Sequence, residues 1–252
     1  MFNIINTSSA RIKTGLMLIS AFFLVGLIDS FFIIWLVLGI MMIISVHEAM
    51  QLFKIDDDKI YLYVSLIWLA VLFYPKPEDL IFLSGIILAS VLAYTKELNK
   101  QLFLPLMYPM ASFLFLLSLY ISFGIATLFW LVVIVIGADV GAYFVGKSMG
   151  ETQFCETSPN KTLEGVLGGV TIASILGMLF APSEISFFVS LIITIATAIA
   201  SVFGDLFESY LKREADVKDS GDILPGHGGI LDRIDGYLFA VIVMIVLLRQ
   251  FS

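Results

Sequence analysis

Acidic side chains are concentrated near the C-terminal end of a chain that is otherwise strongly apolar. Residues 204–235, GDLFESYLKREADVKDSGDILPGHGGILDRID, carry 12 of the chain's 35 charged side chains, and eight of the 12 are acidic. Carboxylates without clusters of His or Cys are hard oxygen ligands, which suit Mg²⁺, Mn²⁺ or Ca²⁺. The acidic surplus therefore predicts a site where divalent cations lie between carboxylates and the phosphates of an anionic substrate.

The spacing within this stretch predicts two helical faces. Four residues follow the i, i+3, i+4, i+7 pattern of one face, over about two turns or roughly 10 Å: Asp205, Glu208, Ser209 and Lys212. Because Asp205 ends an apolar run, we expect its carboxylate at or below the membrane surface, where an ionisable group is costly and functional by default. Asp232 and Asp235 stand three residues apart at the start of the last apolar run and share a face in the same way.

A third acidic position lies within the apolar segment VVIVIGADVGAYFVGK. Asp139, Tyr143 and Gly146 form an i, i+4, i+7 stripe there. A single Asp in such a helix can also serve as a hydrogen-bonding residue in helix packing, so for Asp139 alone both interpretations stay open. Three acidic helix positions near one membrane face favour a functional site.

Residues 158–169, SPNKTLEGVLGG, form a candidate phosphate-binding segment. Ser158 followed by Pro159 predicts an N-cap and a first helical residue, which would present free N–H groups to an anion with Lys161 alongside. The segment is not a Walker A loop, because G-x-x-x-x-G-K-[ST] is absent. Its glycines are equally consistent with close helix packing in a membrane.

Other polar residues near these segments have less specific interpretations. Lys212, Arg213 and Lys218 are candidates for holding substrate phosphate. His227, in the turn sequence PGHGG, is a candidate acid or base, or else stabilises the turn by donating to a backbone carbonyl. We expect His47 and Glu48, at the inner end of an apolar run, to cap that helix or to extend towards the membrane surface, with a functional role as the alternative.

The rest of the chain predicts an all-α polytopic membrane protein. Of its 252 residues 60% are hydrophobic and 14% charged, against about 25% charged in soluble domains. Apolar runs of about 18 or more residues are typical of membrane helices, and strands with open edges cannot lie in lipid. Nine helices are predicted near 12–28, 31–50, 60–74, 79–94, 102–120, 125–146, 163–181, 185–208 and 230–249, with long loops at 147–162 and 209–229. We divide the chain into an N-terminal helical region, 1–122, and a catalytic region, 123–252.

The distribution of Lys and Arg predicts the sidedness. With nine helices and a cytoplasmic N-terminus, twelve of the 14 basic residues fall in cytoplasmic segments and only Lys76 and Arg249 fall outside. Basic residues favour cytoplasmic loops, so we expect a cytoplasmic N-terminus and both long loops on the cytoplasmic side. Arg11 and Lys13 precede an apolar run without a cleavage site, which predicts a retained first helix.

Composition also excludes several classes of site. The single cysteine, Cys155, cannot form an intrachain disulfide, and two histidines do not make a His-rich metal cluster. The net charge of −7 and the absence of a basic tract argue against nucleic acid as a partner.

The motifs in this sequence resemble those of the phosphatidate cytidylyltransferases, also called CDP-diacylglycerol synthases. The family signature is met at Ser209, Leu211, Lys212, Arg213, Lys218, Asp219, Gly221, Leu224, Pro225, His227, Gly228, Gly229, Asp232, Arg233 and Asp235. The upstream D-x-x-A-Y pattern, beginning at Asp139, and the SPxKTxEGxxGG loop also resemble this family. Asn160 departs from it, since many members carry a second Lys there, but Lys161 remains. The motifs cover about 139 to 235.

This resemblance implies a reaction and an assembly. CTP and phosphatidate would give CDP-diacylglycerol and pyrophosphate with Mg²⁺, and a monovalent cation such as K⁺ is a further candidate. It also implies a nine-helix, homodimeric enzyme of phospholipid biosynthesis. We expect it in the bacterial inner membrane, in contact with membrane lipid, with its active site facing the cytoplasm.

The resemblance also assigns roles to individual residues. The metal ligands that it implies are Asp205 and Asp232, to which we add Asp139 from its acidic position in an apolar helix. The predicted catalytic residues are Asp205, Ser209, Lys212, Asp219, Asp232 and Asp235. The predicted substrate-binding residues are Ser158, Lys161, Thr162, Lys212, Arg213, Lys218, His227 and Tyr143.

Two other functions fit parts of the pattern. A secondary transporter couples intramembrane carboxylates to ions, but its sites lie near the bilayer midplane and often in paired repeats, whereas these acids are predicted at helix mouths and the halves show no repeat. A CDP-alcohol phosphotransferase would use the product of the implied reaction, but its pattern of Asp-Gly, Ala-Arg and two later Asp residues is absent.

Overall fold

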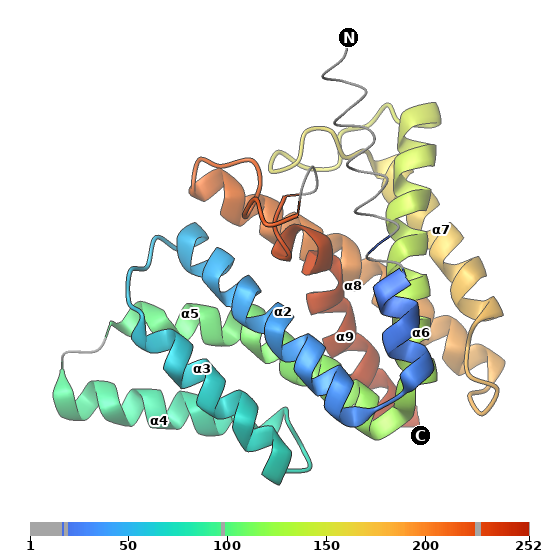
Figure 1. The fold of residues 1–252 in the computed structure, drawn as a ribbon. Helices are drawn as coiled ribbons and strands as arrows, with labels where there is room; N and C mark the ends of the chain where they lie inside the picture. The colour runs from blue at the N-terminus through green and yellow to red at the C-terminus, as the bar shows by residue number, and fades with distance from the viewer. Residues whose placement is uncertain (1–16, 18–19, 97–98, 225–227, 252) are drawn as a thin grey trace. The chain divides into compact units, whose positions relative to one another are not determined.

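The computed structural model describes residues 17, 20–96, 99–224 and 228–251, and within them the regular elements are all helical (Figure 1). The only extended pairings in these ranges are two isolated bridges, Gln153 with Thr162 and Leu224 with Gly228. The predicted all-α class is confirmed. In chain order the elements are a helical stretch at 20–28, α2 (Phe31–Leu52), α3 (Lys59–Ala70), η1 (Val71–Phe73), α4 (Asp79–Thr95), η2 (Lys100–Leu102), α5 (Phe103–Pro105), η3 (Leu106–Met110), α6 (Ala111–Met149), α7 (Leu163–Leu179), α8 (Phe187–Glu214) and α9 (Leu231–Phe251).

The chain forms two compact units that each combine separate stretches of sequence. Unit 1 consists of Met1–Leu117 and Ala215–Arg233, and unit 2 consists of Ser118–Glu214 and Ile234–Ser252. The segment after α8, together with the first residues of α9, therefore belongs with the N-terminal helices. Asp232 is part of unit 1, whereas Asp205 and Asp235 are part of unit 2.

In unit 1, α2 and α3 are joined by a reciprocal tryptophan pair. The indole N–H of Trp35 donates to the carbonyl of Trp68 at 3.2 Å, and the indole N–H of Trp68 donates to the carbonyl of Trp35 at 3.2 Å. The two rings stack with their centroids 6.5 Å apart. Each buried indole N–H thereby has a partner, which fixes the contact between the two helices.

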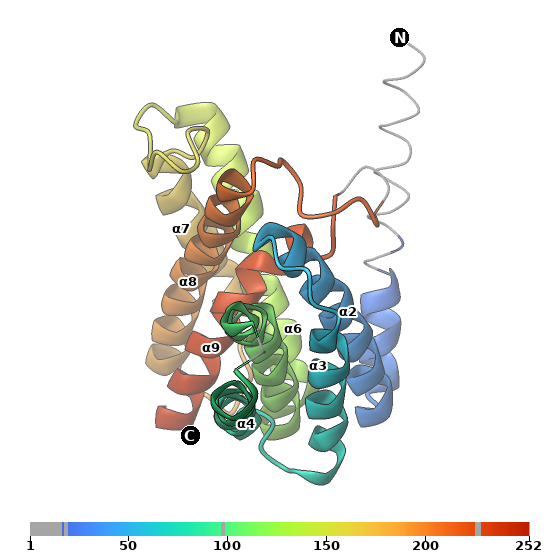
Figure 2. The same ribbon diagram turned by 90° about the vertical axis from the view of Figure 1, so that its left-hand side faces the viewer.

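In unit 2, small residues allow α6, α7 and α8 to pack closely. A Cβ on Gly169 of α7 would lie 2.5 Å from the carbonyl oxygen of Ala138, and the indole N–H of Trp130 reaches the carbonyl of Gly177 at 2.7 Å. α7 runs along α8, as Figure 2 shows from a second side. Close approach at small residues is typical of helix contacts in membranes, so the packing interpretation of the glycines in 158–169 is supported.

Most predicted helix ends agree with the structure, with one correction. The predicted break at 121–124 falls at Gly124, whose φ of 77° and ψ of −179° interrupt α6 in a conformation that favours glycine. The predicted loop at 209–229 is wrong at its start, because α8 continues to Glu214. Charged residues there suggested a loop, but they form the polar last turns of a long helix.

The apolar helices identify a membrane protein. Among the described residues, three helical stretches are long and apolar enough to span a membrane: Phe31–Leu52, Lys100–Met149 and Phe187–Glu214. Shorter apolar helices lie at Lys59–Phe73, Asp79–Thr95 and Leu163–Leu179. The count of nine spans and the side of the N-terminus stay predictions.

Candidate active site

The predicted polar face of α8 is present in unit 2. The Ser209 hydroxyl donates to Asp205 Oδ1 at 3.4 Å, and Lys212 Nζ lies 2.6 Å from Glu208 Oε2. Glu208 is fully buried and Asp205 is half-buried. Both pairs are four residues apart, which is the separation at which side chains meet on a helix.

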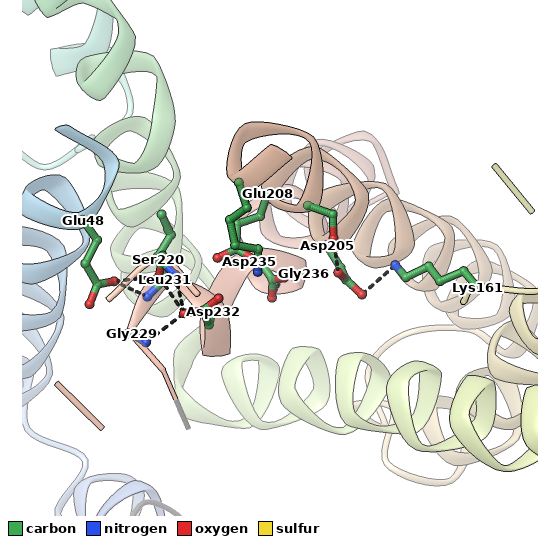
Figure 3. Close-up of polar contacts among 12 residues, drawn as sticks. Glu48, Lys161, Asp205, Glu208, Ser220, Gly229, Leu231, Asp232, Asp235 and Gly236 are labelled. Carbon is green, nitrogen blue, oxygen red and sulfur yellow. Dashed lines mark hydrogen bonds and ion pairs between the residues drawn. The ribbon is translucent and has the colours of Figure 1, made fainter. Parts of the chain in front are cut away.

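Lys161 is brought to this face from the loop before α7. Its Nζ lies 2.6 Å from Asp205 Oδ2, with the two side chains 23% and 36% exposed (Figure 3). The loop is held by backbone hydrogen bonds from Phe154 N to Lys161 O at 2.8 Å and from Leu163 N to Thr152 O at 2.9 Å. Lys161 was predicted to bind substrate phosphate and Asp205 to bind metal. The two side chains contact each other.

The predicted helix start at Ser158 is wrong. Thr162 is the N-cap of α7, and its hydroxyl oxygen accepts a hydrogen bond from Gly165 N at 3.1 Å. Ser158 instead begins a turn in which its carbonyl accepts from Lys161 N at 3.0 Å. Proline is favoured at the second position of such a turn, so Pro159 explains why the Ser-Pro pair lies before the helix.

Asp235 lies beside the same part of α8. A Cβ on Gly204 would be 2.5 Å from the carbonyl oxygen of Asp235, so the backbones of α8 and α9 touch at this point. Asp235 Oδ1 accepts from the N–H of Gly236 at 2.8 Å. Figure 3 shows Asp205, Glu208 and Asp235 on adjacent turns of the two helices. Unit 2 therefore gathers three acidic side chains at one helix contact.

The Asp232 carboxylate in unit 1 is held by fixed donors. Its Oδ2 accepts from Ser220 N, Ser220 Oγ and Gly229 N, each at 2.8 Å (Figure 3). Gly228 lies against it with a φ of 78°, and a Cβ there would be 2.6 Å from Asp232 Oδ2. Donors that orient a carboxylate in this way are typical of the surroundings of metal ligands.

Glu48 is a second carboxylate at the same helix start, and the sequence alone did not indicate its contacts with α9. It comes from α2, is only 2% exposed, and accepts from Ile230 N at 2.9 Å and Leu231 N at 2.7 Å. The expectation that it extends towards the membrane surface is wrong. The signal was present, since Glu48 is an ionisable residue in an apolar helix and the same rule selected Asp139.

The remaining predicted site residues are more exposed. The side chains of Asp139, Tyr143, Arg213, Lys218 and Asp219 are exposed, and those of Ser158 and Lys212 are half-buried. The Lys147 ammonium group donates to the Tyr143 hydroxyl at 3.4 Å. His227 lies outside the described residues.

The described carboxylates suit a magnesium ion that also binds water and substrate better than a metal ion whose ligands all come from the protein. Within the described parts of the chain, no three His, Cys, Asp or Glu side chains come together as a complete metal-binding group. Mg²⁺ typically needs one or two carboxylates and takes its other ligands from water and substrate phosphates. In unit 1 the oriented carboxylate of Asp232 is one candidate ligand, and in unit 2 the half-buried carboxylate of Asp205 is another.

The chain belongs to the cytidylyltransferase family, whose profile matches residues 9–251. It is 43% identical to the phosphatidate cytidylyltransferase of Helicobacter pylori over 236 residues, which cover 92% of this chain and 89% of that protein. It is 34% identical to that of Thermotoga maritima over 231 residues, or 82% and 84% of the two chains. It is 47% identical to that of Bacillus subtilis over 135 residues, or 52% and 50%. The resemblance seen in the motifs is confirmed and extends into the N-terminal half.

Proposed function

We propose that this chain transfers a cytidylyl group from CTP to phosphatidate, giving CDP-diacylglycerol and pyrophosphate for phospholipid biosynthesis. The family match over nearly the whole chain carries the proposal, because it includes every motif that bears charge. The names of the relatives specify the lipid acceptor. The contact between Lys161 and Asp205 supports a single site made by the candidate phosphate-binding loop and the acidic face of α8.

The reaction requires positioning more than it requires acid or base catalysis. The phosphate monoester of phosphatidate is already ionised near neutral pH, and its oxygen forms a bond to the α-phosphorus of CTP. The bond from the α-phosphorus to the bridging oxygen breaks, and pyrophosphate leaves with the electron pair. Alignment and charge neutralisation supply most of the acceleration in such transfers.

The predicted site residues fall into those that would bind substrate phosphates and those that would hold the metal ion. Lys161, with Thr162 and Ser158 in the same loop, would bind CTP phosphates, and Lys212, Arg213 and Lys218 would hold the remaining phosphate charge. Tyr143 and His227 are further substrate contacts. Asp205 and Asp232, with Asp139, would hold Mg²⁺, which neutralises charge developing on the phosphates, with K⁺ as a second candidate ion. Ser209 orients Asp205, and Asp219 and Asp235 would order the lysines and bound water.

The ammonium group of Lys161 lies on Asp205 Oδ2, at 2.6 Å, where a metal ion could also bind. When CTP enters, its phosphates would attract the Lys161 ammonium group away from the carboxylate, and the carboxylate oxygen would become available to a metal ion. A lysine suits this exchange because its charge sits on a long flexible stem.

The setting follows from charge and from the relatives. Twelve of 14 basic residues in predicted inner segments support a cytoplasmic active site. Relatives in bacteria support a location in the bacterial inner membrane. Phosphatidate would enter sideways between helices with its acyl chains in lipid, and the enzyme would act as a homodimer.

A single assay tests the function. Purified protein receives labelled CTP, phosphatidate and Mg²⁺, and we expect the cytidine label to become extractable into organic solvent as pyrophosphate is released. Label that stays in water would contradict the proposal. Replacing phosphatidate with diacylglycerol, which lacks the attacking phosphate, is the matched control and should give no labelled lipid.

A further inference from the structure

We infer that Glu48 of α2 is a positioning residue that fixes the first turn of α9 and thereby the carboxylate of Asp232. The inference rests on the proposed function in one respect, because it gives Asp232 a role in the reaction. Glu48 itself would touch neither substrate. It would act through the backbone that carries Asp232.

The contacts of Glu48 cover the start of α9. Oε2 accepts from Leu231 N at 2.7 Å (Figure 3). Oε1 accepts from Ile230 N at 2.9 Å. N–H groups in the first turn of a helix have no partner within the helix, and a negative charge there is favoured by the helix dipole. Each carboxylate oxygen thus serves one donor directly before Asp232.

Ser220 connects Glu48 to Asp232. Its hydroxyl oxygen lies 2.8 Å from Asp232 Oδ2 and 3.3 Å from Glu48 Oε2. A hydroxyl has one proton to donate, and the shorter distance indicates that it goes to Asp232. Ser220 thus lies within hydrogen-bonding distance of both carboxylates. A displacement of Glu48 would therefore shift Ser220 and, through it, Asp232.

The space around the Glu48 carboxylate is made by glycines. A Cβ on Gly229 would lie 2.5 Å from Glu48 Oε1, and a Cβ on Gly221 would lie 2.7 Å from the same atom. Both glycines belong to the signature stretch. Because these glycines lack a side chain, there is room beside them for a carboxylate from another helix. Glu48 lies outside the signature and contacts residues within it.

Burial makes the role of Glu48 sensitive to substitution. The residue is 2% exposed, so water cannot readily replace a lost acceptor, and an unpaired buried donor is costly. In Glu48→Gln the side chain keeps its shape, but an NH₂ group replaces one oxygen and faces an N–H donor. In Glu48→Asp the charge stays, and the carboxylate is withdrawn by one methylene.

The test measures backbone protection and turnover on the same preparations of full-length protein. Without added metal, hydrogen exchange followed by mass spectrometry should show the amides of Ile230 and Leu231 exchanging at least tenfold faster in Glu48→Gln, with α3 and α4 unchanged. With metal, kcat should fall about 10- to 100-fold, the range found for residues that orient metal ligands. KM for CTP should change little, and Glu48→Asp should recover part of both losses.

A matched control is Asp79→Asn. Asp79 is also a carboxylate in a first helical turn of unit 1, and it accepts from the Tyr74 hydroxyl at 3.0 Å. It should leave exchange at Ile230 and kcat unchanged.

The outcomes separate the two proposals. Wild-type exchange at Ile230 and Leu231 in Glu48→Gln, or faster exchange throughout unit 1, would overturn the positioning role, as would local loosening with unchanged kcat. If the wild-type protein transfers no cytidylyl group, the proposed function fails. The exchange data would then still decide whether Glu48 holds the start of α9.

Discussion

The two acidic groups of this protein are stabilised in different ways. In unit 1 the partners of Glu48 and Asp232 include backbone N–H groups and a serine hydroxyl. In unit 2 the partners of Asp205 and Glu208 include lysine ammonium groups at 2.6 Å, supplied by Lys161 and Lys212. Backbone donors are fixed by the fold, whereas lysine side chains can turn to another anion.

This difference predicts different behaviour of the two groups of carboxylates. Carboxylates held by backbone donors keep their geometry before any ligand arrives, which is the preorganisation that electrostatic catalysis requires. Carboxylates paired with lysines can lose that partner to a phosphate, because a lysine side chain can turn to another anion. We therefore predict a fixed geometry for the unit 1 carboxylates and a substrate-dependent one for the unit 2 carboxylates.

The largest expected effect comes from Asp205→Asn. An amide cannot replace a carboxylate as a metal ligand of equal charge, so cytidylyl transfer should fall at least about 1000-fold. Lys161, being partly exposed, would become solvated, and the thermal midpoint should stay within about 2 °C of wild type. The measurements are label transfer to lipid and thermal unfolding in detergent. Robust activity in this variant would remove Asp205 from the site.

Lys161→Ala should affect substrate binding rather than turnover. Because the side chain is proposed to move from Asp205 to CTP phosphates, KM for CTP should rise about tenfold or more with a smaller change in kcat. Lys161→Arg keeps the charge and is the matched control, with an intermediate KM. A fall in kcat at constant KM would instead mean that Lys161 acts on the transition state alone.

Sequence patterns predicted the local features of this site and missed its long-range contacts. The helical face of Asp205 and Ser209 follows from spacing alone, because side chains four residues apart meet on any α-helix. The pairing of Lys161 with Asp205 depends on how a loop folds back onto α8. No periodicity encodes such a contact.

Glu48 shows the limit most clearly. Its hydrogen bond to Leu231 joins residues 183 positions apart in sequence, and nothing near Glu48 indicates the partner. The error at Ser158 has a different cause, since Ser-Pro starts helices and turns alike. The sequence alone did not distinguish the two, and the extended backbone of Thr162 decided it.

Gly229→Ala tests whether the unit 1 group is as rigid as its donors suggest. The added methyl group would meet Glu48 Oε1 and Ser220 Oγ at 2.5 Å, so unfolding free energy should fall by about 1–3 kcal/mol and kcat by about tenfold. Gly85→Ala in α4 is the control, because nothing lies within 4 Å of its added carbon. It should be neutral or stabilise by up to about 1 kcal/mol. If Gly229→Ala and Gly85→Ala changed the unfolding temperature equally, the residues around Glu48 would be able to move aside for the added methyl group.

The smallest expected effect comes from Ser220→Ala. This change removes the hydroxyl shared by Glu48 and Asp232 but keeps the Ser220 N–H on Asp232 Oδ2, so two of three donors to that oxygen survive. We expect kcat to fall about threefold to tenfold, at or below the low end for groups that orient metal ligands, with KM for CTP unchanged. Ser84→Ala is a matched control, since that buried hydroxyl donates only to Ile81 in its own helix. If Ser220→Ala lowered kcat as far as Glu48→Gln, the hydroxyl rather than the N–H contacts would be the main link between the two carboxylates.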